Sequence, residues 1–556
     1  MSDESIEVEP REEGKGTGKP KKEGGGASAS SLVAAGILLS RIAGLVRERV
    51  FAQYFGTSLY ADVFRAGLRM PNALQNLLGE GTLSASFIPV YAELLEKGRK
   101  EEAGRMAGAV FSLLLALAGA LTLIGVILAP VIVSVFAPGF EGERRELTVM
   151  VTRIIFPMTG LLVLSAWALG ILNSHRKFFI SYTAPVLWNG AIIATLVMFG
   201  GRMEPARLVV ALGWGALVGG ALQFGIQLPW VLRLERDLKI AWNTKLESVR
   251  EAVRNAGPAI MGRGVVQLSG YVDTFLASFL AAGALAAVGF AQILYMLPVS
   301  LFGMSVAAAE LPELSRQRMG AVDVLRVRTS ASLQRIAFYI VPSFVAFVLL
   351  GDVIVAGLYQ TGEFDRTDTI LVYLTLLGLS LGLLASTATR LFSSTFFALR
   401  DTKTPAKFAV VRVVTAAILA FALMVQFEAV PSLGIPAGIF GGITIDGRSL
   451  GAVGLATGSG LAAWVEWGLL RRALRKRIGT VGASASAVAR MFVAALTAAG
   501  AGWGIRLLTP DLHPVLDAIL VFSVYGVVYF GVAYLLKLQE VQAIATRLGG
   551  IVRRVR

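Results

Sequence analysis

Windows of about twenty mainly apolar residues recur along almost the whole 556-residue chain. A helix needs about that length to cross the ~30 Å hydrocarbon core of a bilayer. Fourteen windows can be counted, near residues 32–55, 61–92, 107–136, 147–173, 181–200, 208–232, 255–281, 285–311, 336–358, 369–398, 406–427, 450–470, 486–507 and 515–537. The pattern predicts an all-α polytopic membrane protein with about 14 transmembrane helices.

The first window carries charged side chains at membrane depth, where each costs about 2.5–3.5 kcal/mol on insertion scales. At about 100° per residue, five positions share an arc of about 120° on a helix. They are Ser40, Arg41, Gly44, Arg47 and Glu48, whereas Arg49 points the opposite way. A shared polar face of this kind indicates a water-filled cavity on one side of the helix.

The second window carries a longer polar stripe with successive spacings of three or four residues. Its members are Asp62, Arg65, Arg69, Asn72, Asn76 and Glu80. At ~1.5 Å per residue the stripe runs about 27 Å, nearly the hydrocarbon thickness. The excess of arginine favours an anionic ligand, because guanidinium groups bind phosphate in a bidentate manner. The alternative is internal pairing, Arg41 with Glu48 or Asp62 with Arg65, which would only lock the helices together.

The seventh window repeats the polar face in a weaker form. Arg263, Gln267, Gly270 and Thr274 share one arc, and Asp273 lies at its edge. The eighth window has no charged residue between positions 285 and 309. The cationic character is therefore concentrated in the first half of the chain.

Composition agrees with a membrane protein: 55% of residues are hydrophobic, 16% are charged, and mean hydropathy is +0.68. The absence of cysteine excludes disulfides, thiolate nucleophiles and Cys-ligated zinc or iron–sulfur sites. The two histidines, His175 and His513, fall in predicted loops. There is no Walker A motif and no H-E-x-x-H motif, so a transporter is predicted rather than an enzyme. No cofactor is expected, and energy would come from a Na⁺ or H⁺ gradient or from the membrane potential.

The net charge of +15 follows the predicted topology. Basic clusters mark one membrane face; one of them is Arg471, Arg472, Arg475, Lys476 and Arg477. Since basic loops stay in the cytoplasm, both termini are predicted to be cytoplasmic. Attraction to anionic lipids accounts for the remaining charge, and no nucleic-acid partner is expected.

Landmarks of the first half return in the second. Gly44 and Gly56 precede Pro71 as Gly270 and Gly283 precede Pro298, and segment 131–143 is echoed by 353–365. Parallel repeats of this kind predict two pseudo-symmetric six-helix lobes, with the substrate site between them. The predicted domains are a disordered tail (1–30), two lobes (31–235 and 236–475), an appended helix pair (476–540) and a basic tail (541–556). The alternative is that Gly and Pro recur by chance in any polytopic chain.

Five segments resemble the MurJ/MviN lipid II flippases of the MOP exporter superfamily: residues 40–48, 62–93, 171–189, 273–283 and 399–407. The resemblance covers about residues 30–540. It implies movement of undecaprenyl-pyrophosphoryl-linked peptidoglycan precursor from the inner to the outer leaflet of the bacterial plasma membrane by alternating access. It also implies a central cavity for the headgroup, and a groove for the lipid tail on the last two helices.

The resemblance assigns roles to residues. Ser40, Arg41 and Arg47 match cavity positions, Asp62 and Glu80 match acidic positions of helix 2, and Asp273 resembles a sodium ligand that Thr457 would join. Added to the polar faces, this gives an expected substrate-binding set of Ser40, Arg41, Arg47, Arg65, Arg69, Asn72 and Arg263. The expected gating or charge-compensating set is Glu48, Asp62 and Glu80.

The chain departs from the family pattern where many members carry arginine: it has Gln75 in helix 2 and Ile293 in helix 8. These departures leave two rival functions open. One is export of another lipid-linked polysaccharide or of a drug cation. The other is a flippase-like scaffold that recruits cell-wall synthesis proteins without transporting.

Overall fold

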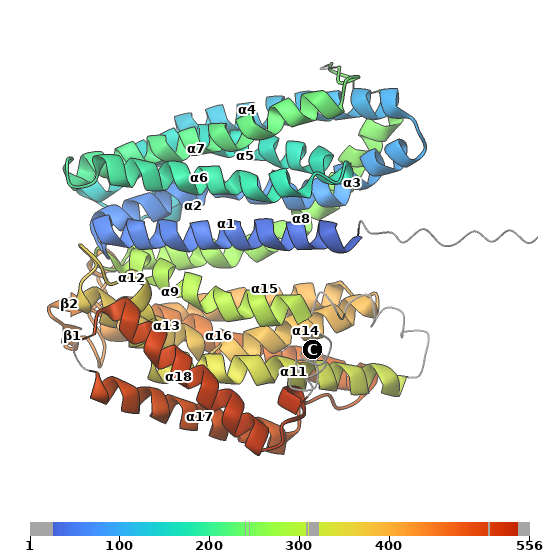
Figure 1. The fold of residues 1–556 in the computed structure, drawn as a ribbon. Coiled ribbons are helices and arrows are strands. Elements are labelled where there is room, and N and C mark those ends of the chain that lie inside the picture. Colours follow the sequence, from blue (N-terminus) through green and yellow to red (C-terminus); the bar gives the residue numbers. More distant parts are fainter. Residues whose placement is uncertain are drawn as a thin grey trace, which may run out of the picture.

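The computed structural model describes residues 26–239, 241–243, 245–306, 310, 322–509 and 512–542, without the side chains of 26–34, 259, 261–269 and 322. The predicted tails and Arg263 therefore lie wholly or largely outside the described residues. Helices account for nearly all of the described chain and form two stacked lobes (Figure 1).

The first lobe lies uppermost in Figure 1. Its helices are α1 (Gly26–Phe55), α2 (Leu59–Leu78), α3 (Glu80–Glu96), α4 (Lys100–Phe136), α5 (Gly142–Ser174), α6 (Phe178–Phe199) and α7 (Pro205–Leu234). The most apolar stretch of α5 is 78% buried, because α2, α4 and α7 pack around this helix. It is the central helix of the lobe.

The second lobe contains α8 (Glu247–Ser278), α9 (Ala284–Pro298), the π-helical η1 (Val299–Met304), α11 (Val322–Leu349), α12 (Gly351–Tyr359), α13 (Arg366–Ser380), α14 (Leu383–Ala398), α15 (Lys403–Phe427) and α16 (Gly451–Ile478). A one-turn helix η2 (Pro431–Leu433) and the hairpin β1 (Thr444–Ile445) and β2 (Arg448–Ser449) lie between α15 and α16. The last helices, α17 (Ala485–Leu508) and α18 (Pro514–Leu535), pack on each other and on α11 and α12.

Nine helices of the described chain are long and apolar enough to cross a membrane, or ten if the bent pair α13–α14 is one span. The other four predicted windows coincide with α1, α2–α3, α8 and α16, which carry more charged residues. The arrangement is compatible with fourteen passes.

The second predicted window differs from the structure in continuity. The second window is two helices, α2 and α3, that meet at Gly79. A Cβ atom at Gly79 would lie 2.3 Å from the carbonyl oxygen of Gln75, so a side chain would clash at this junction. The polar stripe of the second window is therefore interrupted before Glu80.

Candidate functional site

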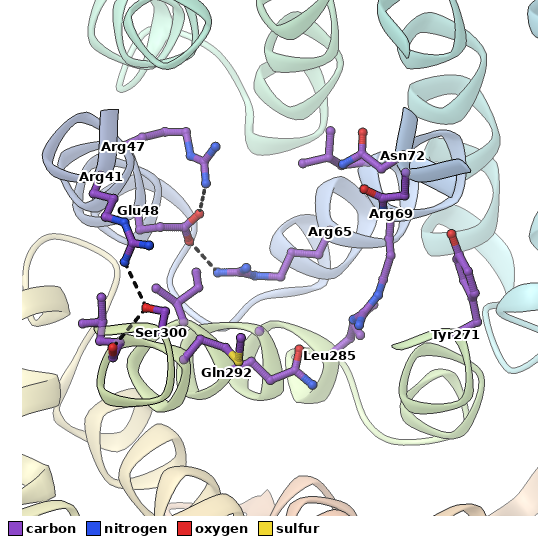
Figure 2. A pocket seen from close by; sticks show the side chains of 16 residues that line it. Arg41, Arg47, Glu48, Arg65, Arg69, Asn72, Tyr271, Leu285, Gln292 and Ser300 are labelled. Carbon is purple, nitrogen blue, oxygen red and sulfur yellow. Dashed lines mark hydrogen bonds and ion pairs between the residues drawn. The ribbon is translucent and has the colours of Figure 1, made fainter. Parts of the chain in front are cut away.

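A cavity of about 520 Å³ lies between the two lobes (Figure 2). Its polar lining consists of Arg41, Arg47, Glu48, Arg65, Arg69, Asn72, Asn76, Tyr271, Gln292 and Ser300. The first lobe supplies all of the charged side chains through α1 and α2, and the second supplies neutral ones through α8, α9 and η1. Glu48 is 6% exposed, whereas Arg41 is an exposed residue. Arg41 lies about two turns further than Glu48 from the C-terminal end of α1, so the cavity opens towards the N-terminal half of that helix.

Glu48 bridges two arginines in the centre of the cavity. Its carboxylate oxygens lie 2.6 Å from Arg47 Nη2 and 2.9 Å from Arg65 Nη2. The Arg65 guanidinium also stands 4.2 Å from the Phe290 ring centre, and that of Arg47 4.9 Å from Trp188. Aromatic faces hold guanidinium planes without consuming their N–H donors. The pair Arg47 and Arg65 therefore keeps donors for a further anion.

Two arginines of the first lobe approach glycines of the second. A Cβ atom at Gly289 would lie 2.7 Å from Arg65 Nη1, and one at Gly270 would lie 2.5 Å from Arg69 Nη2. Arg41 Nη1 completes the contact by donating to Ser300 Oγ at 2.9 Å. The second lobe thus accommodates these three arginines of the first lobe with small or neutral residues.

The structure brings together Arg41, Arg47, Glu48, Arg65, Arg69 and Asn72 of the predicted set. Ser40 is half-buried but does not line the cavity, and exposed Glu80 begins α3, outside it. Arg49 points away as predicted, and donates to the carbonyl oxygens of Gly357 and Leu358 at 3.0 and 2.9 Å. Ile293 lines the cavity, so one position that carries arginine in many family members is apolar here; Gln75 does not line it.

Asp62 lies outside the cavity, fully buried where the lobes meet beyond the C-terminal end of α1. Its Oδ2 atom is 2.6 Å from Arg144 Nη2 and accepts the Gly283 N–H at 2.7 Å, while Oδ1 accepts the Ala286 N–H at 2.6 Å. A carboxylate is favoured at the N-terminus of a helix such as α9. The predicted alternative pairs, Asp62 with Arg65 and Arg41 with Glu48, are wrong: Glu48 holds Arg65, and Asp62 holds Arg144.

A second cluster closes the same end of the molecule. Asp368 of α13 accepts the Thr57 N–H at 3.1 Å and also binds the Thr57 hydroxyl and the Arg448 guanidinium. Gly283 has φ +92°, and a Cβ there would lie 2.0 Å from the Thr57 carbonyl oxygen, so glycine is required. We call this end, with Asp62 and Asp368, the gate end.

The sequence did not single out Arg144, Asp368 or Arg448. The sequence did contain one signal for these residues. Segments 131–143 and 353–365 resemble each other; the first ends immediately before Arg144 and the second immediately before α13, and both end at the gate end. Hydropathy alone assigns charged residues at helix starts and in loops to solvent, whereas here Arg144 and Asp368 are buried where the lobes meet and Arg448 is half-buried beside them.

The expected sodium pair is not formed as predicted. Asp273 accepts Gln292 Nε2 at 3.0 Å and Ser459 Oγ at 3.3 Å, while Thr457 donates to Val453 of its own helix at 2.8 Å. Residues two apart on a helix point about 160° away from each other, so Thr457 faces away from Asp273.

Two guanidinium groups, Arg69 and Arg412, act electrostatically on the Asp273 carboxylate. In the described part of the chain, no three acidic or histidine side chains form a group that could hold a metal ion. The Asp273 carboxylate is therefore surrounded by an amide, a hydroxyl and arginine charge, and sodium binding there stays a prediction.

Comparison with known proteins gives concordant results. A family model described as lipid II flippase MurJ matches residues 51–522. Lipid II flippase MurJ of Burkholderia cenocepacia is 32% identical over 383 residues, which are 67% of this chain and 73% of the relative. Probable lipid II flippase MurJ of Bdellovibrio bacteriovorus is 29% identical over 526 residues, 92% of this chain and 95% of the relative.

Solved structures agree in fold. A lipid II flippase MurJ in an inward closed conformation aligns with TM-score 0.73 and 21% identity, over 91% of this chain and 98% of that one. An inward-facing multidrug resistance MATE transporter of the MOP superfamily aligns with TM-score 0.62 and 19% identity, over 83% of this chain and 99% of that one. At these identities, the likeness establishes the architecture alone.

Proposed function

This chain belongs to the lipid II flippase MurJ family, and from that premise we propose that its central cavity takes up the pyrophosphate-linked headgroup of lipid II and moves it between leaflets by alternating access. The observation that carries the proposal is a cavity with four arginines and one carboxylate, closed at one end by two buried carboxylates, Asp62 and Asp368, that accept hydrogen bonds from the opposite lobe. A transporter needs such a site, and no covalent chemistry is required of it.

The pyrophosphate group matches the central arginines. Arg47 and Arg65 share one carboxylate, Glu48, and an incoming diphosphate offers them more negative charge and more acceptor oxygens. Substrate binding therefore replaces Glu48 as the partner of both guanidinium groups. Asn72 and Gln292, which also line the cavity, supply neutral polar groups suited to the sugars.

Asp62 and Asp368 act as gate residues in this proposal. Release of the Gly283 and Ala286 amides from Asp62, and of Thr57 from Asp368, would separate the lobes at the gate end and expose the cavity there. The predicted cytoplasmic position of the basic termini places the open end of the cavity at the inner leaflet. The gate end would then face the outside of the plasma membrane.

We propose the membrane potential as the energy source. Arg69 and Arg412 near Asp273 already supply the positive charge that a coupled sodium ion would bring. The cavity with its four arginines carries more positive charge when it is empty than when it holds the anionic headgroup. A transmembrane potential therefore acts differently on the loaded and the empty protein, and this difference favours one direction of the transport cycle.

The test is flipping of labelled lipid II in liposomes containing the purified chain. Arg47→Ala and Arg65→Ala each remove charge-assisted hydrogen bonds worth about 1.5–3 kcal/mol, so exposure of the headgroup should slow roughly 10- to 100-fold. Arg153→Ala is the matched control, because this exposed arginine of α5 does not line the cavity.

A depletion strain that Arg47→Ala rescues fully would sink the binding role of that residue. A parent protein that fails to flip beside a working control flippase would favour the scaffold function. Preferred export of an organic cation would favour the drug-exporter function.

A further inference from the structure

A second cavity, of about 470 Å³, lies at the C-terminal end of α16 and shares no lining residue with the central one. It is lined by Trp467, Gly468, Arg471, Arg472, Arg475, Thr480 and Val481. The helical members follow one another at spacings of one and three residues, so they form one face of the helix. The proposed function does not use this cavity.

The chain itself closes the cavity on one side. After α16, Gly479 adopts φ +86° and the backbone turns back along the helix. Val481 is 3% exposed, and the Gly482 N–H donates to Ser330 Oγ of α11 at 3.4 Å, which fixes the returning segment. Thr480 and Val481 therefore form a wall, and the arginines line a concavity rather than a convex surface.

The three arginines of this cavity have no acidic partner among the described residues, and one of them is held by an aromatic ring. The Arg471 guanidinium stands 5.0 Å from the Trp467 ring centre. Among the described residues, Arg471, Arg472 and Arg475 form no ion pair and no hydrogen bond through their side chains. By contrast, the neighbouring Arg477 pairs with Asp401 at 3.4 Å.

Two ordinary explanations account for basic residues here but not for their arrangement. Positive charge at this end of a helix follows from topology and from the helix dipole. Neither effect requires three unpaired arginines around one hollow, where like charges repel one another. An anion held between them removes that repulsion.

The depth of the cavity indicates what the anion is attached to. Counting ~1.5 Å per residue from Gly451, a ~30 Å hydrocarbon core ends about twenty residues later, near Arg471. Trp464 and Trp467 pack edge to face at 5.4 Å at this level, where tryptophan is enriched in membrane proteins. The arginines therefore lie at headgroup depth.

An apolar strip leads from the membrane side to the cavity. Leu461, Trp464 and Val465 are 40%, 40% and 38% exposed, and they continue the helix face of Gly468 and Arg472. A ligand with an anionic head and an apolar tail matches both parts, whereas a free phosphate would leave the strip uncovered.

We propose that this cavity binds the phosphodiester headgroup of an anionic membrane phospholipid, whose acyl chains lie along Leu461, Trp464 and Val465. The site is distinct from the substrate cavity and does not depend on flipping. It places a bound lipid on the second lobe, on the side of the molecule opposite the gate end.

The test uses the full-length chain, delipidated in detergent and titrated with short-chain phosphatidylglycerol, short-chain phosphatidylcholine or inorganic phosphate, with native mass spectrometry as the readout. The variant is Arg471→Gln/Arg475→Gln. The matched control is Lys403→Gln/Lys407→Gln, which removes equal charge from exposed positions on α15 at the same end.

Phosphatidylglycerol should bind the parent more tightly than phosphatidylcholine. The cavity variant should lose about fivefold in affinity per arginine, roughly thirtyfold in all, with the control unchanged. Equal loss in both variants would overturn the proposal, because it would indicate diffuse attraction. Inorganic phosphate that binds as tightly as the lipid would overturn the lipid assignment, and an unfolded variant would be replaced by Arg475→Gln alone.

Discussion

Asp62→Asn should open the gate end. The substitution removes the charge that Arg144 meets at 2.6 Å and weakens the bonds from the Gly283 and Ala286 amides. The Asp62–Arg144 pair lies within the first lobe, so only the two hydrogen bonds from the second lobe distinguish the closed arrangement from the open one. Hydrogen bonds to a charged group are worth about 1.5–3 kcal/mol each, and since asparagine retains one acceptor oxygen, about 3 kcal/mol is the reasonable loss for the two together. That energy is lost only from the closed arrangement, so the equilibrium constant for opening should rise roughly 100-fold.

The absence of cysteine makes the assay direct, because introduced thiols carry no background. Arg202→Cys and Ser432→Cys place spin labels at exposed positions of the two lobes at the gate end. Pulsed electron paramagnetic resonance in nanodiscs should then detect a longer distance in Asp62→Asn. The control is Asp446→Asn, an exposed gate-end aspartate. An unchanged distance distribution, in a variant that melts like the parent, would refute the role of Asp62 in closure.

Three further predictions follow from other contacts. Glu48→Gln should lower the melting temperature, because it removes the carboxylate that pairs with both arginines. Calorimetry should nevertheless show that the variant binds inorganic pyrophosphate about tenfold more tightly, because both guanidinium groups are then free to bind it. Weaker binding would contradict the proposal that the diphosphate replaces Glu48 as their partner. At fixed membrane potential, lipid II flipping should be as fast in choline buffer as in sodium buffer. The same should hold for Ser459→Ala, which removes a hydroxyl that contacts Asp273. A sodium requirement would show that a cation acts at Asp273. Hydrogen bonds from Thr404 hold the pKa of the Asp401 carboxyl below its usual range. The resulting stabilisation is complete above about pH 4 and is lost as the pH falls through the lowered folded-state pKa, so the melting difference between parent and Asp401→Asn should shrink in acid.

The sequence was most informative where geometry is local. Helical periodicity alone grouped Arg41, Arg47 and Glu48, and it grouped Arg65 and Arg69; all five line the cavity. Periodicity works within one helix because side-chain direction there depends only on position along the helix. The same rule correctly turned Arg49 away.

The sequence was uninformative where partners are distant. Asp62 belongs to the same periodic stripe as Arg65, yet it contacts Arg144 and Gly283, which lie 82 and 221 positions further along the chain. Which helix end meets which depends on how the lobes pack, and no local pattern encodes it. The break at Gly79 similarly removed Glu80 from a stripe that spacing alone extends to it.

The position of Asp62 on α2 explains how loading could reach the gate. Asp62, Arg65 and Arg69 succeed one another at spacings of three and four on one helix, so Asp62 lies only about 4.5 Å along the axis from Arg65. Arg65 holds Glu48 of α1, and Asp62 holds Arg144 of α5 and the start of α9. A diphosphate that draws Arg65 away from Glu48 frees α2 from α1 on its cavity side. Any rotation of α2 that follows must also move Asp62 against α9. Substrate binding and gate opening therefore both act on helix α2. Because α2 is one rigid element, no chain of intermediate residues is needed to connect the cavity with the gate end.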